Sequence, residues 1–372
     1  MRPVSAWIFP RTASSHIHDH RQPRSRLGRT ALLPAPLYDL PPVPRSTAHP
    51  LRLHPRSQQS LDPRQKFRKP DENPLRTILM LDSSRNREKE LANFIQWAAQ
   101  RPQVRAALLT STLAVPGAAT DALTDYDIIL VLTDVRPFHQ DRAWLEDFGP
   151  VLALYRDPLE THDDLPLSGY VVQFADGLKI DFTLWPVEML RRIAAAPTLP
   201  DELDAGYRVL IDKDHLTHTL KPPTYRAYIP QPPTHQQYHD TLENFFLEAI
   251  YAAKYLWRDD LMAAKFVLDH EMKQEQLRPM LEWLIEIEHG WSVRPGPLGR
   301  GLKKWLSPDL WAELEATYAA AGLPENWEAL FRTIALMRKV ASRVGGHLGF
   351  EYPAEMDRRT VAMAQQIRAM PR

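Results

Sequence analysis

The spacing of apolar residues changes along the chain, and each change predicts a different kind of structure. In the segment 88–100, apolar residues recur at helical spacing, which predicts an amphipathic helix with Leu91, Phe94, Ile95 and Ala98 on its buried side. Short apolar runs follow, and their β-branched residues and polar borders predict strands. These runs span 104–112, 127–133, 151–155, 170–174 and 179–185.

The dipeptide Asp176-Gly177 separates the last two runs. Such a dipeptide between alternating segments is a strong signal for a hairpin. A helix is also expected at 140–148, between the second and third runs. Strands mixed with helices over about 85–215 predict an α+β region.

Beyond this region the chain becomes helical. A proline-rich segment, 222–233, separates the two regions, because proline lacks a backbone donor and resists helix formation. Thr234 is suited to cap the next helix, and Ser307 followed by Pro308 predicts the start of another one. Long segments with helical periodicity then predict a second, helical domain. They span 238–257, 261–288, 326–344 and 354–370.

Residues 1–75 differ from the rest because proline, arginine and histidine crowd them. Such a segment cannot pack as regular structure, so we expect a disordered tail, or an upstream extension with Met80 as an alternative start. The dense arginines leave a nucleic-acid-binding arm open, although the prolines and the lack of interleaved aromatics weigh against it. The predicted organisation is a tail at 1–75, an α+β domain at 76–221 and a helical domain at 234–370.

Composition excludes several classes of protein. The 46 basic and 46 acidic residues give a formal net charge of zero, which gives no support for broad attraction to nucleic acid or to an anionic membrane. The chain has no cysteine, so disulfides, thiolate metal sites and thiol nucleophiles are excluded. No apolar run approaches the roughly 18 residues of a membrane span, and no secretion signal is evident. We therefore expect a cytoplasmic protein.

Two aspartates stand at the start of the second apolar run. Asp125 and Asp127 are two positions apart, and alternate residues of a strand share one face, so their carboxylates are expected to project together. Two such carboxylates repel each other unless a cation lies between them. Mg²⁺ prefers oxygen ligands and is usually held by one or two carboxylates together with substrate phosphates. The pair therefore suggests metal-assisted phosphoryl chemistry.

Asp181 is the third candidate of this kind. It lies inside the run 179–185, whose apolar residues occupy the other face of the expected strand. A carboxylate in that setting is costly unless it lies in a cleft, is paired, or binds a metal. If this strand lies beside the acid pair, three carboxylates converge, and Asp181 could take the proton from an attacking hydroxyl. The structural alternative is that Asp181 pairs with an arginine or lysine and that Asp125 caps a turn.

Hydroxyl side chains end the first predicted strand, at Thr110, Ser111 and Thr112. Backbone N–H groups and hydroxyls at a turn that follows a strand can hold phosphate. This signal is not specific on its own, since many strands end in serine or threonine.

The order of these motifs along the chain resembles that of the nucleotidyltransferases, and more narrowly that of the aminoglycoside 6-adenylyltransferase (streptomycin adenylyltransferase) family. The motifs are Thr110-Ser111-Thr112, then Asp125-Tyr126-Asp127-Ile128, then Ile180-Asp181. Further similarity runs through the helical region, so the resemblance covers about 85–370. The matching segments there lie at 253–260, 278–283, 301–306, 327–331 and 349–353.

The resemblance implies transfer of AMP from ATP to a hydroxyl of an aminoglycoside such as streptomycin. Asp125, Asp127 and Asp181 would bind Mg²⁺ with the triphosphate, and Asp181 would help to activate the acceptor hydroxyl. Lys254 and Arg258, four positions apart on one helix face, could reach the triphosphate, or they could form a solvated basic face. The implied fold is an N-terminal nucleotidyltransferase domain, with a mixed sheet flanked by helices, and a C-terminal helical bundle that binds the substrate.

One motif departs from the family pattern, which usually has Gly-Ser-Arg where this chain has Thr110-Ser111-Thr112. Glycine lets the backbone approach phosphate closely, and arginine supplies a permanent cation with forked donors. The chain could therefore bind ATP less tightly, or use another nucleotide or acceptor. Two alternative functions follow: a nucleotidyltransferase acting on a metabolite, a protein or an RNA, and a non-catalytic nucleotide-binding homologue.

Overall fold

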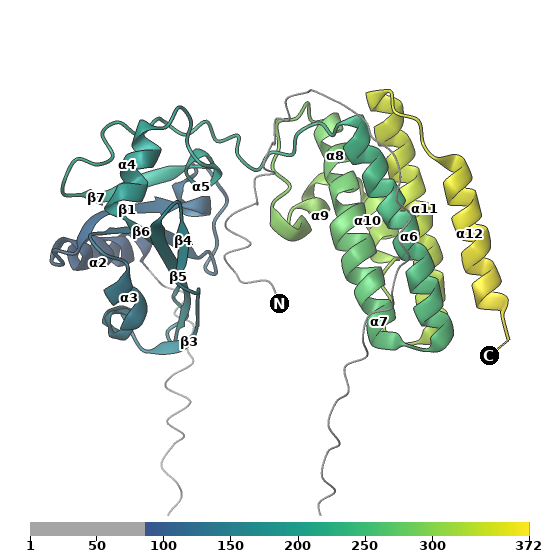
Figure 1. Ribbon diagram of the computed structural model, residues 1–372, viewed down its shortest axis with the longest axis horizontal. Coiled ribbons are helices and arrows are strands. Elements are labelled where there is room, and N and C mark those ends of the chain that lie inside the picture. The colour runs from purple at the N-terminus through teal and green to yellow at the C-terminus, as the bar shows by residue number, and fades with distance from the viewer. Residues whose placement is uncertain (1–85, 372) are drawn as a thin grey trace, which may run out of the picture. The chain divides into compact units, whose positions relative to one another are not determined.

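The computed structural model describes residues 86–371, which form an α+β protein (Figure 1). The strands within these residues lie between Val104 and Asp212, and the long helices begin at His235. The fold class predicted from the sequence is therefore confirmed. The predicted tail at 1–75 lies outside the described residues, as do the first residues of the α+β domain. The domain boundaries at 76–221 and 234–370 stay a prediction.

A seven-stranded sheet forms the first part of the described chain, in the order β3-β5-β6-β2-β1-β7, with β4 paired to β5. The central strands β2 and β6 are parallel, whereas the other described pairs are antiparallel. Parallel neighbours begin at the same edge, so the residues that open β2 and β6 lie side by side. The strands are β1 (Val104–Thr110), β2 (Tyr126–Leu132), β3 (Val151–Arg156), β4 (Glu160–His162), β5 (Leu165–Phe174), β6 (Lys179–Pro186) and β7 (Tyr207–Asp212).

Different helices cover the two faces of the sheet, because alternate strand residues point to opposite sides. On one face Phe182 of β6 belongs to an apolar cluster with the buried residues of α2 (Arg87–Ala99). On the other face Trp185 belongs to a cluster with the buried side of α4 (Val187–Ala195). Asp181 shares the face of Trp185, four residues earlier on the strand. The aspartate therefore avoids the aromatic core on the α2 face.

The hairpin predicted at Asp176-Gly177 is confirmed, since β5 and β6 pair as antiparallel neighbours on either side of it. Gly177 has a φ of 92°, a left-handed conformation that favours glycine. Asp176 Oδ1 accepts a hydrogen bond from the N–H of Leu178 at 3.0 Å. The turn fixes the register of β6, and it thereby places Lys179 and Asp181 at the start of that strand.

The helix expected at 140–148 is confirmed in part. The structure has a short helix α3 (Arg136–Gln140) followed by a separate 3₁₀ helix η3 (Ala143–Phe148). Asp141 separates them, because its backbone is extended and its Oδ1 accepts a hydrogen bond from the N–H of Ala143 at 2.9 Å. The apolar pattern also did not predict β4, β7, α4 or α5 (Asp201–Asp204).

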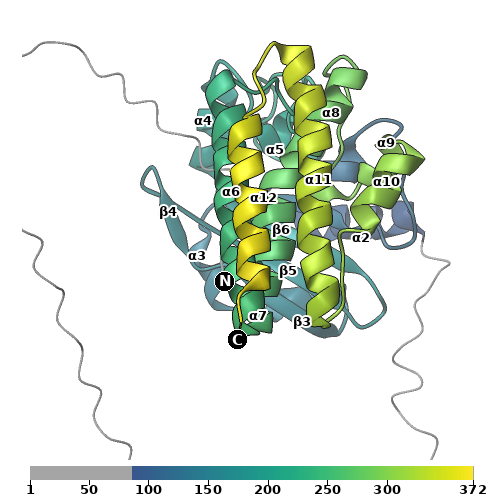
Figure 2. The same cartoon turned by 90° about the vertical axis from the view of Figure 1, so that its right-hand side faces the viewer.

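Helices from His235 onward pack around one apolar core, and α12 runs beside α6 in both views (Figures 1 and 2). The long periodic segments predicted for this region are confirmed as helical. None of the helices described within 86–371 is long and apolar enough to cross a membrane. The helices are α6 (His235–Arg258), α7 (Leu261–Lys265), α8 (Arg278–Glu288), α9 (Leu302–Trp305), α10 (Pro308–Glu315), α11 (Leu323–Leu348) and α12 (Ala354–Ala369), with a π-helix η4 (Phe266–Leu277) and a 3₁₀ turn η5 (Pro297–Gly299).

Both predicted helix caps are present. Thr234 Oγ1 accepts a hydrogen bond from the N–H of Gln237 at 3.1 Å, and the Gln237 side chain accepts one from the N–H of Thr234 at 2.8 Å. Ser307 accepts a hydrogen bond from the N–H of Leu310 at 3.4 Å at the start of α10. These bonds satisfy backbone donors that the first turn of a helix leaves unpaired.

Replacing Thr234 with alanine is expected to lower the free energy of unfolding by about 1 kcal/mol, because the first turn of α6 loses its cap. Thr241→Ala is the matched control, since Thr241 lies inside the same helix and its hydroxyl bonds only to the carbonyl of Gln237. We expect the control to change stability by no more than about 0.5 kcal/mol. Urea denaturation of the two variants measures the difference, and equal losses would contradict the capping role.

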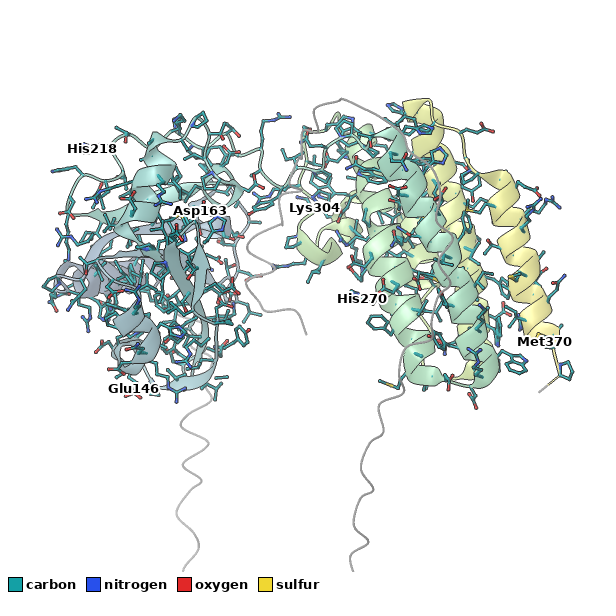
Figure 3. The ribbon with its side chains drawn as sticks, in the orientation of Figure 1. Glu146, Asp163, His218, His270, Lys304 and Met370 are labelled. Carbon is teal, nitrogen blue, oxygen red and sulfur yellow. The ribbon has the colours of Figure 1, made fainter. Side chains whose placement is uncertain are left out.

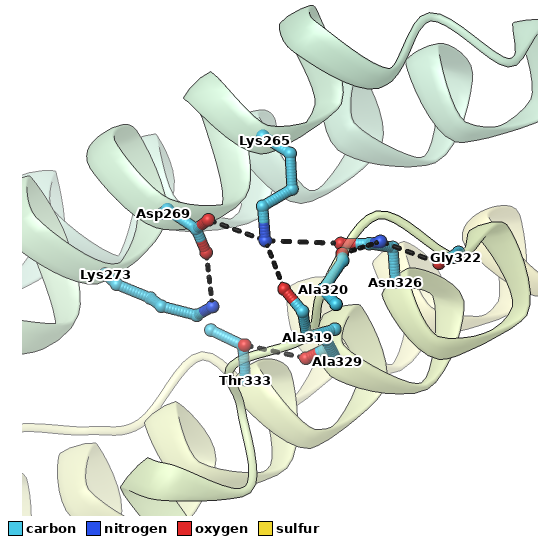
Figure 4. Close-up of polar contacts among 9 residues, drawn as sticks. All are labelled: Lys265, Asp269, Lys273, Ala319, Ala320, Gly322, Asn326, Ala329 and Thr333. Atoms are coloured by element: carbon cyan, nitrogen blue, oxygen red, sulfur yellow. Dashed lines mark hydrogen bonds and ion pairs between the residues drawn. The ribbon is translucent and has the colours of Figure 1, made fainter.

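The predicted segment 261–288 is helical throughout, but η4 in its middle has the wider π-helical hydrogen bonding. A polar network lies along it (Figure 4). Asp269 bonds through its two oxygens to Lys265 Nζ and Lys273 Nζ, both at 2.7 Å. Lys265 also donates to the carbonyl of Ala319 at 2.8 Å. This network ties the π-helix to the chain that leads into α11.

His270 lies on the same π-helix but outside this network. Its imidazole is exposed and stands 5.1 Å from the ring centre of Phe266 (Figure 3). A zinc-binding helix would need a second histidine four positions later, where this chain has Gln274. His270 is therefore a surface residue rather than part of such a motif.

Candidate active site

The three aspartates singled out by the sequence lie where the two central strands β2 and β6 begin. Asp127 in β2 is the register partner of Asp181 in the parallel strand β6, so their side chains project from one face. Asp125 directly precedes β2, and a lysine connects its carboxylate to that of Asp181. These three residues are called the acidic cluster below.

Lys179 is the residue that connects the acidic cluster. Its Nζ donates to Asp125 Oδ2 at 2.7 Å, and to Asp181 Oδ1 and Oδ2 at 2.8 and 2.9 Å. The lysine side chain is 28% exposed, and those of Asp125 and Asp181 are 40% and 26% exposed. The sequence pattern did not single out Lys179. The available signal was its position two residues before Asp181, which puts both side chains on one face of β6.

Burial and neighbouring charges set the protonation of this site. Burial, followed by the charge of Asp181, raises the pKa of Asp127 from 3.8 to about 6, while the Ser111 hydroxyl and Lys179 oppose the rise. Burial also raises the pKa of Asp181. Burial by itself would lower the pKa of Lys179, but its hydrogen bonds to Asp125 and Asp181 outweigh that effect and raise it. Lys179 therefore holds its proton more firmly because it lies between Asp125 and Asp181.

The hydroxyl motif follows β1 next to the acidic cluster, since Thr110 is the register partner of Asp127. Thr110 is buried, and its hydroxyl donates to the carbonyl of Asp127 at 3.4 Å, so it offers little surface to a ligand. Ser111 has a φ of 59°, a left-handed conformation that is uncommon outside glycine and that costs energy. Thr112 is exposed. The backbone of Thr110 is extended, with a φ of −127°, so this position does not require glycine.

The two predicted cations of the helical region, Lys254 and Arg258, both lie on α6 near its C-terminus. Both side chains are exposed, and Lys254 Nζ stands 5.3 Å from the ring centre of Tyr251. Their spacing puts them on one side of the helix, as predicted. Contact between these residues and the nucleotide stays a prediction.

The acidic cluster offers only oxygen donors, which are the ligands that Mg²⁺ prefers. Within 86–371, no group of three or more histidine, aspartate or glutamate side chains is arranged as a ready metal site. The ammonium of Lys179 bonds to two of the three carboxylates, so an ion would share or replace these bonds. A small pocket of about 50 Å³ borders Asp125 and Lys179, which is far below the roughly 300 Å³ of a typical ligand site.

Known proteins are similar to this chain over most of its length. A model of the family described as streptomycin adenylyltransferase matches residues 84–367. An aminoglycoside 6-adenylyltransferase from Bacillus subtilis (strain 168) is 30% identical over 275 residues, covering 72% of this chain and 93% of that protein. One from Campylobacter jejuni is 29% identical over 276 residues, covering 72% and 91%. The crystal structure of an aminoglycoside 6-adenyltransferase from Bacillus subtilis is 26% identical, covers 77% of this chain and 100% of that one, and gives a TM-score of 0.39.

The fold and these matches define an enzyme of the nucleotidyltransferase class. The chain belongs to the streptomycin adenylyltransferase family, because the family match covers most of its length. The family resemblance stated from the sequence is therefore confirmed.

Proposed function

We propose that this protein transfers AMP from ATP to a hydroxyl of an aminoglycoside, such as streptomycin, in a reaction that depends on Mg²⁺. The observation that carries the proposal is the acidic cluster at the start of the neighbouring parallel strands β2 and β6, in a chain that belongs to an adenylyltransferase family. Relatives named aminoglycoside 6-adenylyltransferase support the choice of acceptor.

The three aspartates have separate roles in this proposal. Asp125 and Asp127 would hold Mg²⁺, and Asp181 would complete its site; the ion would neutralise the triphosphate and the charge that develops during transfer. Asp181 accepts the proton of the acceptor hydroxyl, and its raised pKa suits it to that task, because a stronger base takes the proton more readily. The acceptor oxygen forms a bond to the α-phosphorus, and the bond to the pyrophosphate oxygen breaks.

The remaining predicted contacts serve the nucleotide. Thr110, Ser111 and Thr112 lie beside Asp127 at the end of β1, and Ser111 and Thr112 have the more accessible hydroxyls. We propose that Lys254 and Arg258 bind the triphosphate, and that the helical domain at 234–370 contributes the acceptor site. The domain at 76–221 then carries the chemistry.

Purified protein mixed with ATP, Mg²⁺ and streptomycin is expected to release pyrophosphate and to give a product heavier by one adenylyl group. The measurement combines a pyrophosphate assay with mass spectrometry of the antibiotic. Omission of Mg²⁺ in the presence of a chelator is expected to stop the reaction, since the triphosphate then lacks its counter-ion. Absence of product with streptomycin and with all other aminoglycosides tried would contradict the proposed acceptor.

The change in the hydroxyl motif favours a second candidate, a nucleotidyltransferase with another acceptor. Thr112 stands where the family usually has arginine, so a permanent cation and a forked donor are missing. Transfer to a metabolite, a protein or an RNA end would then show as pyrophosphate release without any aminoglycoside product. A non-catalytic homologue is separated from both by calorimetry, because it would bind ATP with Mg²⁺ without turnover, or would not bind it.

A further inference from the structure

Lys179 does not extend its ammonium into water, as an ordinary strand lysine does. Lys179 instead bonds to three oxygens of two carboxylates, 2.7–2.9 Å away. These carboxylates come from different segments, since Asp125 directly precedes β2 and Asp181 belongs to β6.

Lys213, directly after β7, shows what a structural lysine looks like next to the same sheet. Its Nζ donates to the carbonyls of Ala98 and Arg101 at 2.8 and 2.7 Å. Those acceptors are neutral, and they tie the end of α2 to the chain after β7. The hydrogen bonds of Lys179 described above go to the carboxylates of Asp125 and Asp181. These residues would also hold the metal ion. The Lys179 ammonium therefore lies where positive charge is needed for the proposed reaction.

We propose that Lys179 is an internal counter-cation of the acidic cluster, which neutralises Asp125 and Asp181 when no divalent ion is bound and competes with that ion for them. This inference rests on the proposed metal-dependent function. Lys179 is thus a positioning residue: it keeps the two carboxylates together against their mutual repulsion. Its long, flexible side chain allows the ammonium to leave when an ion arrives.

Competition of this kind has a consequence for the order of binding. A divalent ion that binds without nucleotide must displace the Lys179 ammonium from Asp125 and Asp181 before it can bind their carboxylates. An ion that arrives with a triphosphate brings phosphate oxygens, which give the displaced ammonium new partners. The protein therefore binds a free divalent ion weakly and binds it more tightly together with a nucleotide. Without the ammonium this coupling between ion and nucleotide becomes smaller.

The test compares Mn²⁺ binding by the full-length wild type and by Lys179→Met, using electron paramagnetic resonance with and without a non-hydrolysable ATP analogue. We expect Lys179→Met to bind Mn²⁺ about tenfold more tightly without nucleotide, because a unit charge beside the ion is removed. We also expect the analogue to improve Mn²⁺ binding less in this variant than in the wild type. Lys179→Arg keeps the charge and is expected to resemble the wild type.

Lys213→Met is the matched control, since it removes an ammonium beside the same sheet without touching the acidic cluster. It is expected to leave Mn²⁺ affinity unchanged. Thermal unfolding gives a second measurement: Lys179→Met should lose stability in a chelator and recover it with Mg²⁺, whereas Lys213→Met should show the same loss under both conditions. If Lys179→Met does not fold, Lys179→Gln serves in its place, because glutamine is also uncharged.

The outcomes separate this inference from the proposed function. Unchanged Mn²⁺ affinity in Lys179→Met overturns the inference, even if the wild type adenylylates streptomycin. Tighter Mn²⁺ binding in that variant supports the inference, even if the wild type forms no aminoglycoside product and the proposed acceptor is wrong. If neither protein binds Mn²⁺, the acidic cluster is not a metal site and the inference is overturned.

Discussion

Replacing Asp127 with asparagine is expected to lower the rate of adenylyl transfer by about 10²–10³-fold, the usual cost of losing one electrostatic contact to a transition state. Asparagine keeps the size of the side chain but removes the negative charge that favours a bound Mg²⁺. Loss of the Asp127 charge also changes the electrostatic field at Asp181, its register partner. The measurement is the initial rate of pyrophosphate release at saturating streptomycin and ATP with Mg²⁺.

The same substitution is expected to stabilise the metal-free protein at alkaline pH. The pKa of Asp127 is raised from 3.8 to about 6 in the folded protein, so between these values the folded state keeps a proton that the unfolded state has released. The favourable contribution of that proton is fully present below about pH 4 and is lost as the pH rises through 6. Asp127→Asn removes this dependence. At pH 8 in a chelator we expect the variant to have a free energy of unfolding about 1–2 kcal/mol higher than the wild type. The rise in pKa sets a limit of about 3 kcal/mol on this gain. Near pH 4 we expect no gain.

Asp134→Asn is the control for both measurements, because Asp134 lies just beyond the other end of β2. Its Oδ1 accepts a hydrogen bond from the N–H of Arg136 at 3.0 Å, and the amide oxygen of asparagine can accept the same bond. Transfer at the wild-type rate by Asp127→Asn would show that Asp127 has been given the wrong role. If Asp127→Asn is less stable than the wild type at pH 8, the buried charge of Asp127 does not destabilise the metal-free protein.

The convergence of the acidic cluster follows from rules that can be applied to the sequence. Alternation along a strand places Asp125 and Asp127 on one face, and the same rule separates Asp181 from its apolar neighbours. The step that had to be assumed was the pairing of the two strands, because periodicity says nothing about which strands are neighbours. The structure supplies that pairing as the parallel ladder of β2 and β6.

Lys179 shows why part of the site was missed. Alternation alone puts it on the face of Asp181, but a lysine at the start of a strand is usually solvated. Its contact is with Asp125, which lies 54 positions earlier in the sequence, just before another strand. A sequence can therefore indicate the ligands of a site more readily than the counter-charge that balances them.

The missed secondary structure has a physical cause as well. The strand β7 pairs only with β1 among the described strands and is half exposed, so it lacks the strong apolar alternation that predicts a strand. The segment 261–288 has helical spacing, but that spacing does not separate an α-helix from the π-helix η4. Caps were predicted more reliably at Thr234 and Ser307, because a cap depends on contacts within one turn.

The second large effect is expected in the network of Figure 4, where Asp269→Asn should lower the free energy of unfolding by about 3 kcal/mol. The Lys273 side chain is only 1% exposed, and its bond to Asp269 is 2.7 Å long. Burial lowers the pKa of Lys273, and Asp269 opposes that effect. Asparagine can still accept a hydrogen bond through its amide oxygen, but it carries no charge. The substitution therefore leaves the buried ammonium with neutral neighbours, the amide and the ring of Tyr318, whose centre is 4.1 Å from Nζ.

A double-mutant cycle distinguishes the unpaired charge from a general loss of packing. Lys273→Met replaces the buried ammonium with an apolar chain of similar length, and Asp269→Asn/Lys273→Met is expected to be more stable than Asp269→Asn alone, because no ammonium is left unpaired. The single Asp269→Asn variant should also become more stable as the pH rises, since a lysine with a lowered pKa in the folded state favours folding once it has lost its proton. Urea denaturation at two pH values measures both effects. Equal losses in the single and double variants, with no dependence on pH, would show that Asp269 acts through Lys265 and the chain before α11 instead.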